Sequence, residues 1–145
     1  IIYLRFEKDA IFYSTFLIHG MSKVGDEINQ SNFICELSSF VRAKTIGRET
    51  DRIIIMGDFN SLPESDAIKI LNDVGYRDSF THSKQAPYGP VGTFNSFNWN
   101  AELNRRIDYI FLGKYFFIEK YGVLTDSFEK RYPSDHQPVQ VVLSW

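Results

Sequence analysis

The chain alternates between runs of apolar residues with strand-like spacing and runs with helical spacing. Apolar runs rich in β-branched and aromatic residues predict strands over 1–6, 10–19, 52–56, 107–112, 116–123 and 139–143. Apolar residues at helical spacing predict helices over 26–44 and 65–74, and 81–92 is a turn-rich loop. The order of these elements predicts a mixed α/β layer structure.

Short polar stretches mark the predicted boundaries. Glu7–Asp9 predicts a hairpin turn, and Gly47 is a stop signal after the first helix. Ser61 and Glu64 have the spacing of a capping box that would open the second helix. Cys35, the only cysteine, falls in the apolar helical pattern, so we expect a small core residue and no intrachain disulfide.

Length and composition exclude several classes of protein. The 145 residues suffice for one domain, and the aromatic content of 16% supports a sizeable core. A formal net charge of −2 argues against a strongly basic nucleic-acid-binding face. No apolar run approaches the roughly 20 residues that a membrane span requires.

Candidate chemistry begins at the end of the strand at 52–56, in the sequence Gly57-Asp-Phe-Asn60. Residue alternation places Asp58 and Asn60 on one side and Phe59 in the core. The carboxyl ends of strands in α/β sheets are the usual place for a site. Asp and Asn are equally common in turns, so this tetrapeptide alone indicates either.

Two later stretches favour a site over a turn. Asp108 lies inside an apolar strand, where a carboxylate needs a partner or a metal. Asp135 and His136 are adjacent in a loop that contains two prolines, just before the last strand. His is the side chain best suited to proton transfer near neutral pH, and a carboxylate such as Asp108 could fix its tautomer.

These motifs carry a family resemblance. Gly57-Asp-Phe-Asn60, Arg106-Ile-Asp-Tyr109 and Ser134-Asp-His-Gln-Pro-Val139 occur in the order and spacing of the endonuclease/exonuclease/phosphatase superfamily. From about Tyr13 to Trp145 the chain resembles the carboxyl-terminal half of its bacterial members. The resemblance implies a DNase I-like α/β sandwich, of which this chain supplies about one half as a mixed sheet with flanking helices.

The resemblance also implies roles for matched residues. Asp58 would activate the attacking water, and Asn60 would position the phosphate. His136 would transfer a proton or stabilise the phosphate, with Asp108 orienting it. His19, at the end of its strand, would be a second phosphate-contacting histidine, although Gly-Met follows it here instead of the family's apolar residue and Asp.

Metal and substrate contacts are implied in the same way. Asp135 and Asp58 would hold a divalent ion, and hard oxygen ligands suit Mg²⁺ or Mn²⁺ rather than zinc. The residues expected to contact substrate are Asn60, Phe94, Asn95 and Arg106. The implied function is a metal-dependent phosphoesterase whose substrate is a small molecule, a lipid headgroup or a nucleic acid. The alternative is an inactive, truncated domain that serves as a structural or interaction module.

The match to only half of a family domain gives three further expectations. Residues 1–145 would form a single domain that is truncated at its amino terminus and lacks the family's early Asn and its metal-binding Glu. One apolar sheet face would be left uncovered, so the chain is either part of a longer domain or a homodimer through that face. Metal affinity would be weak because the Glu ligand is missing.

Overall fold

The computed structural model describes residues 1–21 and 26–145, and its elements follow the predicted order. Its strands and helices are β1 (Ile2–Lys8), β2 (Ile11–His19), α1 (Glu27–Thr45), β3 (Arg52–Asp58), α2 (Asp66–Asp73), β4 (Arg77–Asp78), β5 (Asp108–Leu112), β6 (Phe117–Val123) and β7 (Val139–Ser144). The predicted boundaries differ from these by one or two residues. Only β4 is not predicted, because two residues are too few to produce a pattern.

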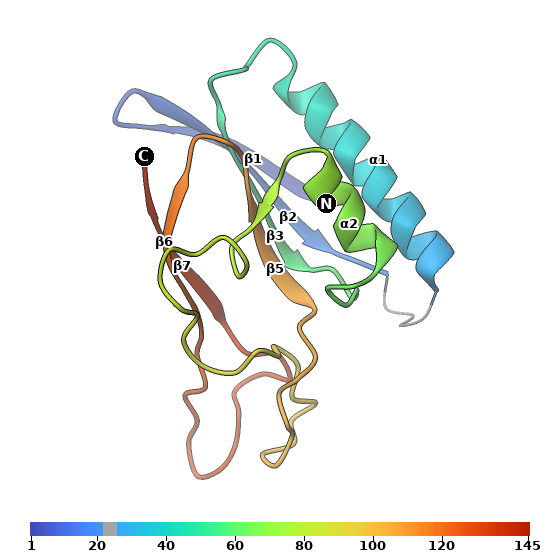
Figure 1. The fold of residues 1–145 in the computed structure, drawn as a ribbon, viewed down its shortest axis with the longest axis vertical. Helices are drawn as coiled ribbons and strands as arrows, with labels where there is room; N and C mark the ends of the chain where they lie inside the picture. Colours follow the sequence, from blue (N-terminus) through green and yellow to red (C-terminus); the bar gives the residue numbers. More distant parts are fainter. Residues whose placement is uncertain (22–25) are drawn as a thin grey trace.

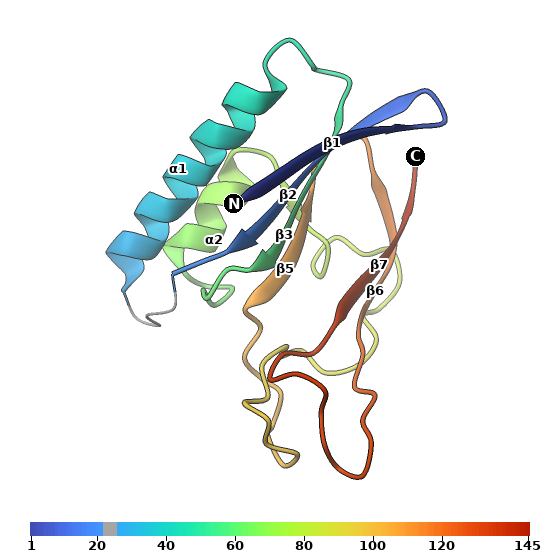
Figure 2. The same cartoon turned by 180° about the vertical axis from the view of Figure 1, so that it is seen from behind.

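The main sheet has five strands in the order β1-β2-β3-β5-β4. Strand β3 runs parallel to β2 and antiparallel to β5, so the sheet is mixed as expected. Both helices cover one face of this sheet (Figures 1 and 2). Strands β6 and β7 form a separate two-stranded sheet, whose Ile118 packs with Tyr13 and Leu112 of the main sheet.

The core between the sheet and the helices explains the helical pattern. Ile34, Leu37 and Val41 of α1 are fully buried against strand residues such as Phe16 and Ile55. The expected apolar stripe of α1 is therefore confirmed, and its first turn is capped by the Asp26 side chain. In the described ranges, neither helix is both long and apolar enough to cross a membrane.

Two local predictions are wrong. Cys35 is exposed, because it lies one position beyond the buried Ile34 and so faces away from the sheet. Helix α2 is capped by Ser65, whose Oγ accepts the backbone N–H of Ile68. Ser61 instead donates its hydroxyl to the Phe59 carbonyl, so it belongs to the turn after β3.

The sheet face opposite the helices is apolar and partly uncovered. Tyr3 stacks on Phe16 of the helix-covered core, so its neighbours Ile2 and Leu4 point to the other face. Ile2 is 66% exposed, Leu4 57% and Leu17, which is paired with Ile2, 44%. Strands β6 and β7 therefore cover this face only in part, as the sequence led us to expect.

Gly57 lies where β2 and β3 come closest, just before the candidate site. Its φ is +136°, and a Cβ built on it would lie 2.0 Å from the Ile18 carbonyl oxygen. Only glycine combines this backbone conformation with this approach. The residue is therefore needed within the strand, rather than for a turn at the end of the strand.

We expect Gly57→Ala to lower the free energy of unfolding by roughly 2–4 kcal/mol, because the added methyl group forces the two strands apart. Gly47→Ala is the matched control. Gly47 also has a positive φ, of +72°, but its Cβ would meet nothing within 4 Å. That control should lose only about 1 kcal/mol. Urea unfolding of both variants measures the difference, and equal losses would contradict the close-approach argument.

Candidate active site

Three strands bring their polar residues side by side at one edge of the main sheet. His19 of β2 is the register partner of Asp58 in β3, and Asp58 is the partner of Asp108 in β5. The His19 Nε2 lies 3.6 Å from an Asp58 carboxylate oxygen, and the His19 side chain is 77% exposed. His19, Asp58 and Asp108 thus lie side by side because the end of β2, the end of β3 and the start of β5 are in register.

Asn60 fixes the orientation of Asp58. Its backbone N–H donates to Asp58 Oδ1 at 2.8 Å, and its side-chain Nδ2 donates to Asp58 Oδ2 at 3.0 Å. Asn60 has a φ of +50°, a conformation that Asn tolerates better than most residues. The buried Gln30 of α1 donates to the Asn60 carbonyl at 2.8 Å. Asn60 is only 8% exposed, so in this arrangement it holds the carboxylate in place.

Asp108 and His136 form a hydrogen-bonded pair that a buried threonine completes. The His136 Nδ1 lies 2.8 Å from Asp108 Oδ2, as the sequence led us to expect. Thr93, fully buried, donates its hydroxyl to the same oxygen at 2.6 Å. The Thr93 hydroxyl oxygen also accepts the backbone N–H groups of Ile107 and Asp108. This network leaves the Nε2 side of the imidazole for another partner.

Burial and hydrogen bonding act in opposite directions on this pair. Burial raises the pKa of the Asp108 carboxyl, although the bonds from Thr93 and His136 favour its anion. Burial alone would lower the pKa of His136, but the hydrogen bond and negative charge of Asp108 outweigh it. The pKa of His136 is therefore raised above its ordinary value, and the imidazolium is favoured.

Asp58, Asp108 and His136 form a cluster that could hold a metal ion. Each offers a ligand atom, and these atoms lie within 4.8 Å of one another. Asp135, expected at the metal, is not in this cluster, and its Oδ1 lies 3.5 Å from the Ser134 hydroxyl. The structure thus gathers Asp58 with His136, which is expected to transfer a proton or stabilise the phosphate, and with Asp108, which is expected to orient His136. Metal binding by Asp135 stays a prediction.

Arg106 does not lie where a substrate-binding residue is expected. Its side chain is 3% exposed and forms a bidentate ion pair with Asp78, at 3.0 and 2.7 Å. The guanidinium also lies between the rings of Phe80 and Tyr109, 4.6 and 4.4 Å from their centroids. Its charge is already neutralised in the core, so Arg106 is a structural residue of the loop before β5.

Asn95 is likewise buried, and it joins two loops instead of facing solvent. Its Nδ2 donates to the Ser134 carbonyl at 3.0 Å, and its Oδ1 accepts the Phe97 N–H at 2.6 Å. At 1% exposure it has no free face for substrate. Phe94 is half-buried, and its ring packs edge-on against His136 with centroids 5.1 Å apart. Of these two expected substrate contacts, only Phe94 lies against a reactive side chain.

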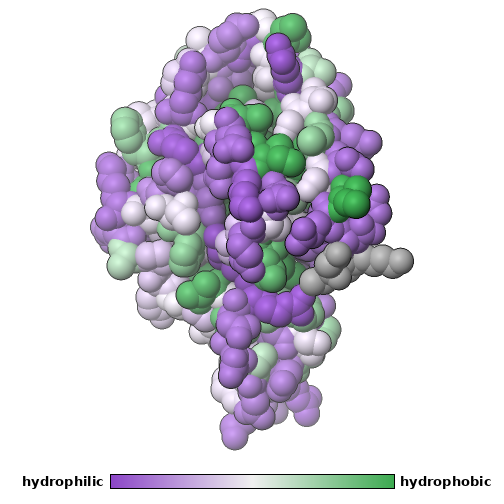
Figure 3. Space-filling view, turned by 45° about the vertical axis from the view of Figure 1, so that its right-hand side comes forward, coloured by the Kyte–Doolittle hydropathy of each residue, from purple (hydrophilic) through white to green (hydrophobic). Residues whose placement is uncertain are grey.

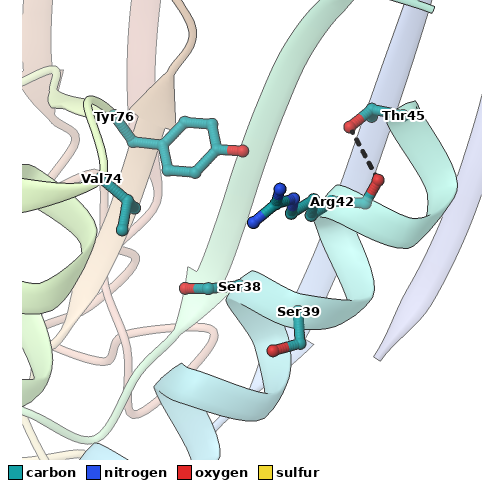
Figure 4. A pocket seen from close by; sticks show the side chains of 6 residues that line it. All are labelled: Ser38, Ser39, Arg42, Thr45, Val74 and Tyr76. Atoms are coloured by element: carbon teal, nitrogen blue, oxygen red, sulfur yellow. Dashed lines mark hydrogen bonds between the residues drawn. The ribbon is translucent and has the colours of Figure 1, made fainter. Parts of the chain in front are cut away.

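One cavity away from the candidate site lacks the groups for this chemistry. A cavity of about 400 Å³ lies between α1 and the loop after α2, lined by Ser38, Ser39, Arg42, Thr45, Val74 and Tyr76 (Figure 4). It shares no residue with the Asp58–Asp108–His136 cluster and contains no carboxylate. It therefore offers neither a metal ligand nor a general base.

Sequence reasoning missed the supporting roles of Thr93 and Gln30. Thr93 stands next to two residues expected near the substrate, but nothing in the sequence indicates its bonds to Asp108 or to the β5 backbone. Gln30 breaks the apolar stripe of α1, and a buried amide in such a stripe signals a polar partner. That partner, the Asn60 carbonyl, becomes visible only in the fold.

Comparison with known proteins places the chain in a family. The model of the endonuclease/exonuclease/phosphatase family matches residues 2–136, most of the chain. The chain therefore belongs to this family, and the resemblance inferred from its three motifs is confirmed. None of the curated proteins compared with the chain matches it significantly.

Solved structures confirm the DNase I-like fold. A family member from Bacteroides thetaiotaomicron is 28% identical with a TM-score of 0.86, over 97% of this chain and 54% of that one. A mannosyl-6-phosphatase from the same organism is 28% identical with a TM-score of 0.84, over 94% and 53%. The human nocturnin catalytic domain shares the fold at 20% identity and a TM-score of 0.67, over 97% and 51%. The chain thus spans about half the length of the structures it matches.

The Asp108–His136 pair predicts an NMR titration. In the unaltered chain we expect His136 to titrate above pH 6.5, because the Asp108 anion stabilises the imidazolium. Asp108→Asn removes that charge, so the pKa of His136 should fall. His82, in a separate loop, serves as the internal control. A His136 pKa that does not respond to Asp108→Asn would show that the pair does not set its protonation.

Proposed function

We propose that the chain carries the proton-transfer half of a divalent-metal-dependent phosphoesterase site. The observation that carries the proposal is the convergence of Asp58, Asp108 and His136 from three separate motifs. Membership of the endonuclease/exonuclease/phosphatase family supports the same reaction class. A water would attack the phosphorus, forming a new P–O bond while the bond to the leaving oxygen breaks.

Each residue of the site has a role that its contacts support. Asp58, held by two hydrogen bonds from Asn60, would take a proton from the attacking water. His136, kept as a cation by Asp108, would donate from Nε2 to a phosphoryl oxygen or to the leaving oxygen. His19, exposed beside Asp58, would contact another phosphoryl oxygen. These donors and acceptors match the charges that develop during hydrolysis.

The donor set is compatible with a hard divalent cation. Asp58 and Asp108 bring carboxylate oxygens within 4.8 Å of each other and of a His136 nitrogen. Oxygen-rich ligand sets suit Mg²⁺ or Mn²⁺. Asp58 and Asp135 would hold the ion, and Asp58 lies in the cluster that the structure assembles. When bound, such an ion neutralises the phosphoryl oxygens and lowers the pKa of coordinated water.

The names of structural neighbours cover different phosphate esters. One is a mannosyl-6-phosphatase, and another is a sphingomyelinase C from Streptomyces griseocarneus that is 16% identical. The net charge of −2 disfavours an extended polyanion such as DNA, which is bound mainly through Lys and Arg. We therefore propose a small phosphate ester as the substrate.

Hydrolysis of an aryl phosphomonoester and an aryl phosphodiester tests the site directly. With Mg²⁺ or Mn²⁺, we expect His136→Ala to lower kcat/KM by at least about 100-fold, because proton transfer at the phosphate is lost. His82→Ala is the matched control and should keep full activity, since the His82 Nδ1 hydrogen-bonds to Thr81 and the Asp78 carbonyl and His82 is not part of the Asp58–Asp108–His136 cluster. Equal rates for the two variants, or turnover that persists in a chelator, would contradict the proposal.

A second candidate, an interaction module, is favoured by the uncovered sheet face of Ile2, Leu4 and Leu17. We propose that two copies of the chain bury this face against each other. This face adjoins the candidate site, because Leu17 and His19 lie on the same side of β2 and Leu17 lines a cavity together with Asp108.

Sedimentation of the 16.9 kDa chain tests the assembly. We expect a dimer that Leu17→Glu converts to a monomer, because a carboxylate cannot be buried unpaired in an apolar interface. Ile46→Glu is the control, since Ile46 is 77% exposed after α1 on the helical side. A stable, monodisperse monomer of the unaltered chain would rule out the dimer.

A further inference from the structure

A group of aromatic side chains lies on the two loops that carry the candidate site. Phe97 and Trp99 belong to the loop between Thr93 and Asn104, and Tyr132 belongs to the loop before His136. Phe97 is 66% exposed, and Trp99, at 39%, packs on Tyr132 with ring centroids 5.3 Å apart. We call Phe97, Trp99 and Tyr132 the aromatic rim. The two loops project from the lower end of the molecule, away from the helices (Figure 1).

The rim is fixed to the catalytic loop by hydrogen bonds. The backbone N–H groups of Asn95 and Ser96 both donate to the Asp135 carbonyl, at 2.8 and 3.2 Å. The buried Asn95 amide also connects Ser134 to Phe97. Phe97 therefore follows directly after the two residues, Asn95 and Ser96, whose N–H groups bind the carbonyl of Asp135, the neighbour of His136. The Phe94 ring, three residues before Phe97, packs edge-on against His136, so the same loop contacts the catalytic histidine and carries the rim.

The backbone of the rim is strained in a way that keeps Phe97 exposed. Ser96 and Phe97 have φ values of +54° and +57°. Two successive left-handed residues are unfavourable, and a bulky aromatic residue in this conformation is uncommon. Such strain concentrates at functional sites, where the surrounding structure maintains it. The fold thus holds an apolar ring in water beside the catalytic loop.

The polar residues around the rim indicate what it would bind. Between Thr93 and Asn104 the chain has no Lys or Arg, and three asparagines, Asn95, Asn98 and Asn100, stand among the aromatic residues. The loop 124–136 has three acidic and two basic residues, so it is not a cationic surface either. The projecting end is mainly hydrophilic on the face seen in Figure 3. These features disfavour a nucleic-acid strand or an anionic membrane.

We propose that the aromatic rim binds the ring of a monosaccharide phosphate whose phosphate occupies the Asp58–His136 site. The inference rests on the proposed function and names its substrate class. A pyranose presents an apolar C–H face that can pack on Trp99, and its hydroxyl groups can bond to the amides of Asn98 and Asn100. Trp99 and Tyr132 pack on each other, so a nucleobase cannot insert between these two rings.

The test compares a phosphate ester that has a sugar ring with one that has none. The full chain, with Mg²⁺, is titrated with glucose 6-phosphate and with glycerol 3-phosphate while the two Trp indole N–H signals are followed by NMR. We expect the Trp99 signal to shift and glucose 6-phosphate to bind about tenfold more tightly, the range of one aromatic contact. Trp99→Ala should reduce this ratio to near one, and Trp145→Phe, at the far end of the chain, should preserve it.

Phe97→Asn separates a binding role from a structural one. Asn tolerates the left-handed conformation better than Phe, so the urea midpoint of this variant should rise. The affinity ratio for the two phosphates should fall at the same time. A ring that serves only the fold would give the opposite result, with lower stability and an unaltered ratio.

Other outcomes would overturn the inference. Equal affinities for the two phosphates in the unaltered chain would do so, as would tighter binding of adenosine 5′-monophosphate or of vesicles containing phosphatidylserine. Phosphate release from both esters is measured in parallel. Release without any preference for the ring would contradict the sugar site but not the hydrolysis. Ring-dependent binding without release would contradict the hydrolysis but not the sugar site.

Discussion

The burial of two opposite charges at the start of β5 is the constraint on which the site depends. Arg106 and Asp108 flank the buried Ile107, and neither charge can remain unpaired there. Arg106 forms an ion pair with Asp78 of β4. Asp108 accepts a hydrogen bond from Thr93 and is hydrogen-bonded to His136. Polar bonds of Arg106 and Asp108 therefore connect β4 and the loops before β5 and β7 to the sheet. Loss of the Arg106–Asp78 or the Asp108–His136 pair would leave a charge unpaired and would also remove a bond that holds a loop to the sheet.

The same arrangement explains which parts of the site the sequence could predict. Asp58 ends β3, Asp108 begins β5 and His136 lies in the loop just before β7, so alternation and the order of the elements indicate that the three share one end of the sheet. Arg106 lies within a motif and was expected at the substrate. Its partner Asp78 is 28 residues away on a strand of two residues, which no local pattern reveals. Whether a charge in a motif faces solvent depends on such distant partners.

Local exceptions in the fold have similar causes. Cys35 stands next to a buried position, and one residue on a helix turns a side chain by about 100° away from the core. Ser61 and Ser65 are both plausible caps, and the choice between them depends on where the turn after β3 ends. The uncovered face of β1 and β2 was predictable, since half of a two-layer fold must leave one sheet without its partner.

Gly57 has a wider consequence for how the site can vary. The distance between β2 and β3 is set there by main-chain atoms in contact, with no side chain between them. Core residues such as Ile55 and Phe16 can therefore be exchanged over evolution, and the layers can shift to suit them, while His19 and Asp58 keep their separation. The backbone at Gly57 therefore fixes the separation of His19 and Asp58, and substitutions among the core side chains leave that separation unchanged.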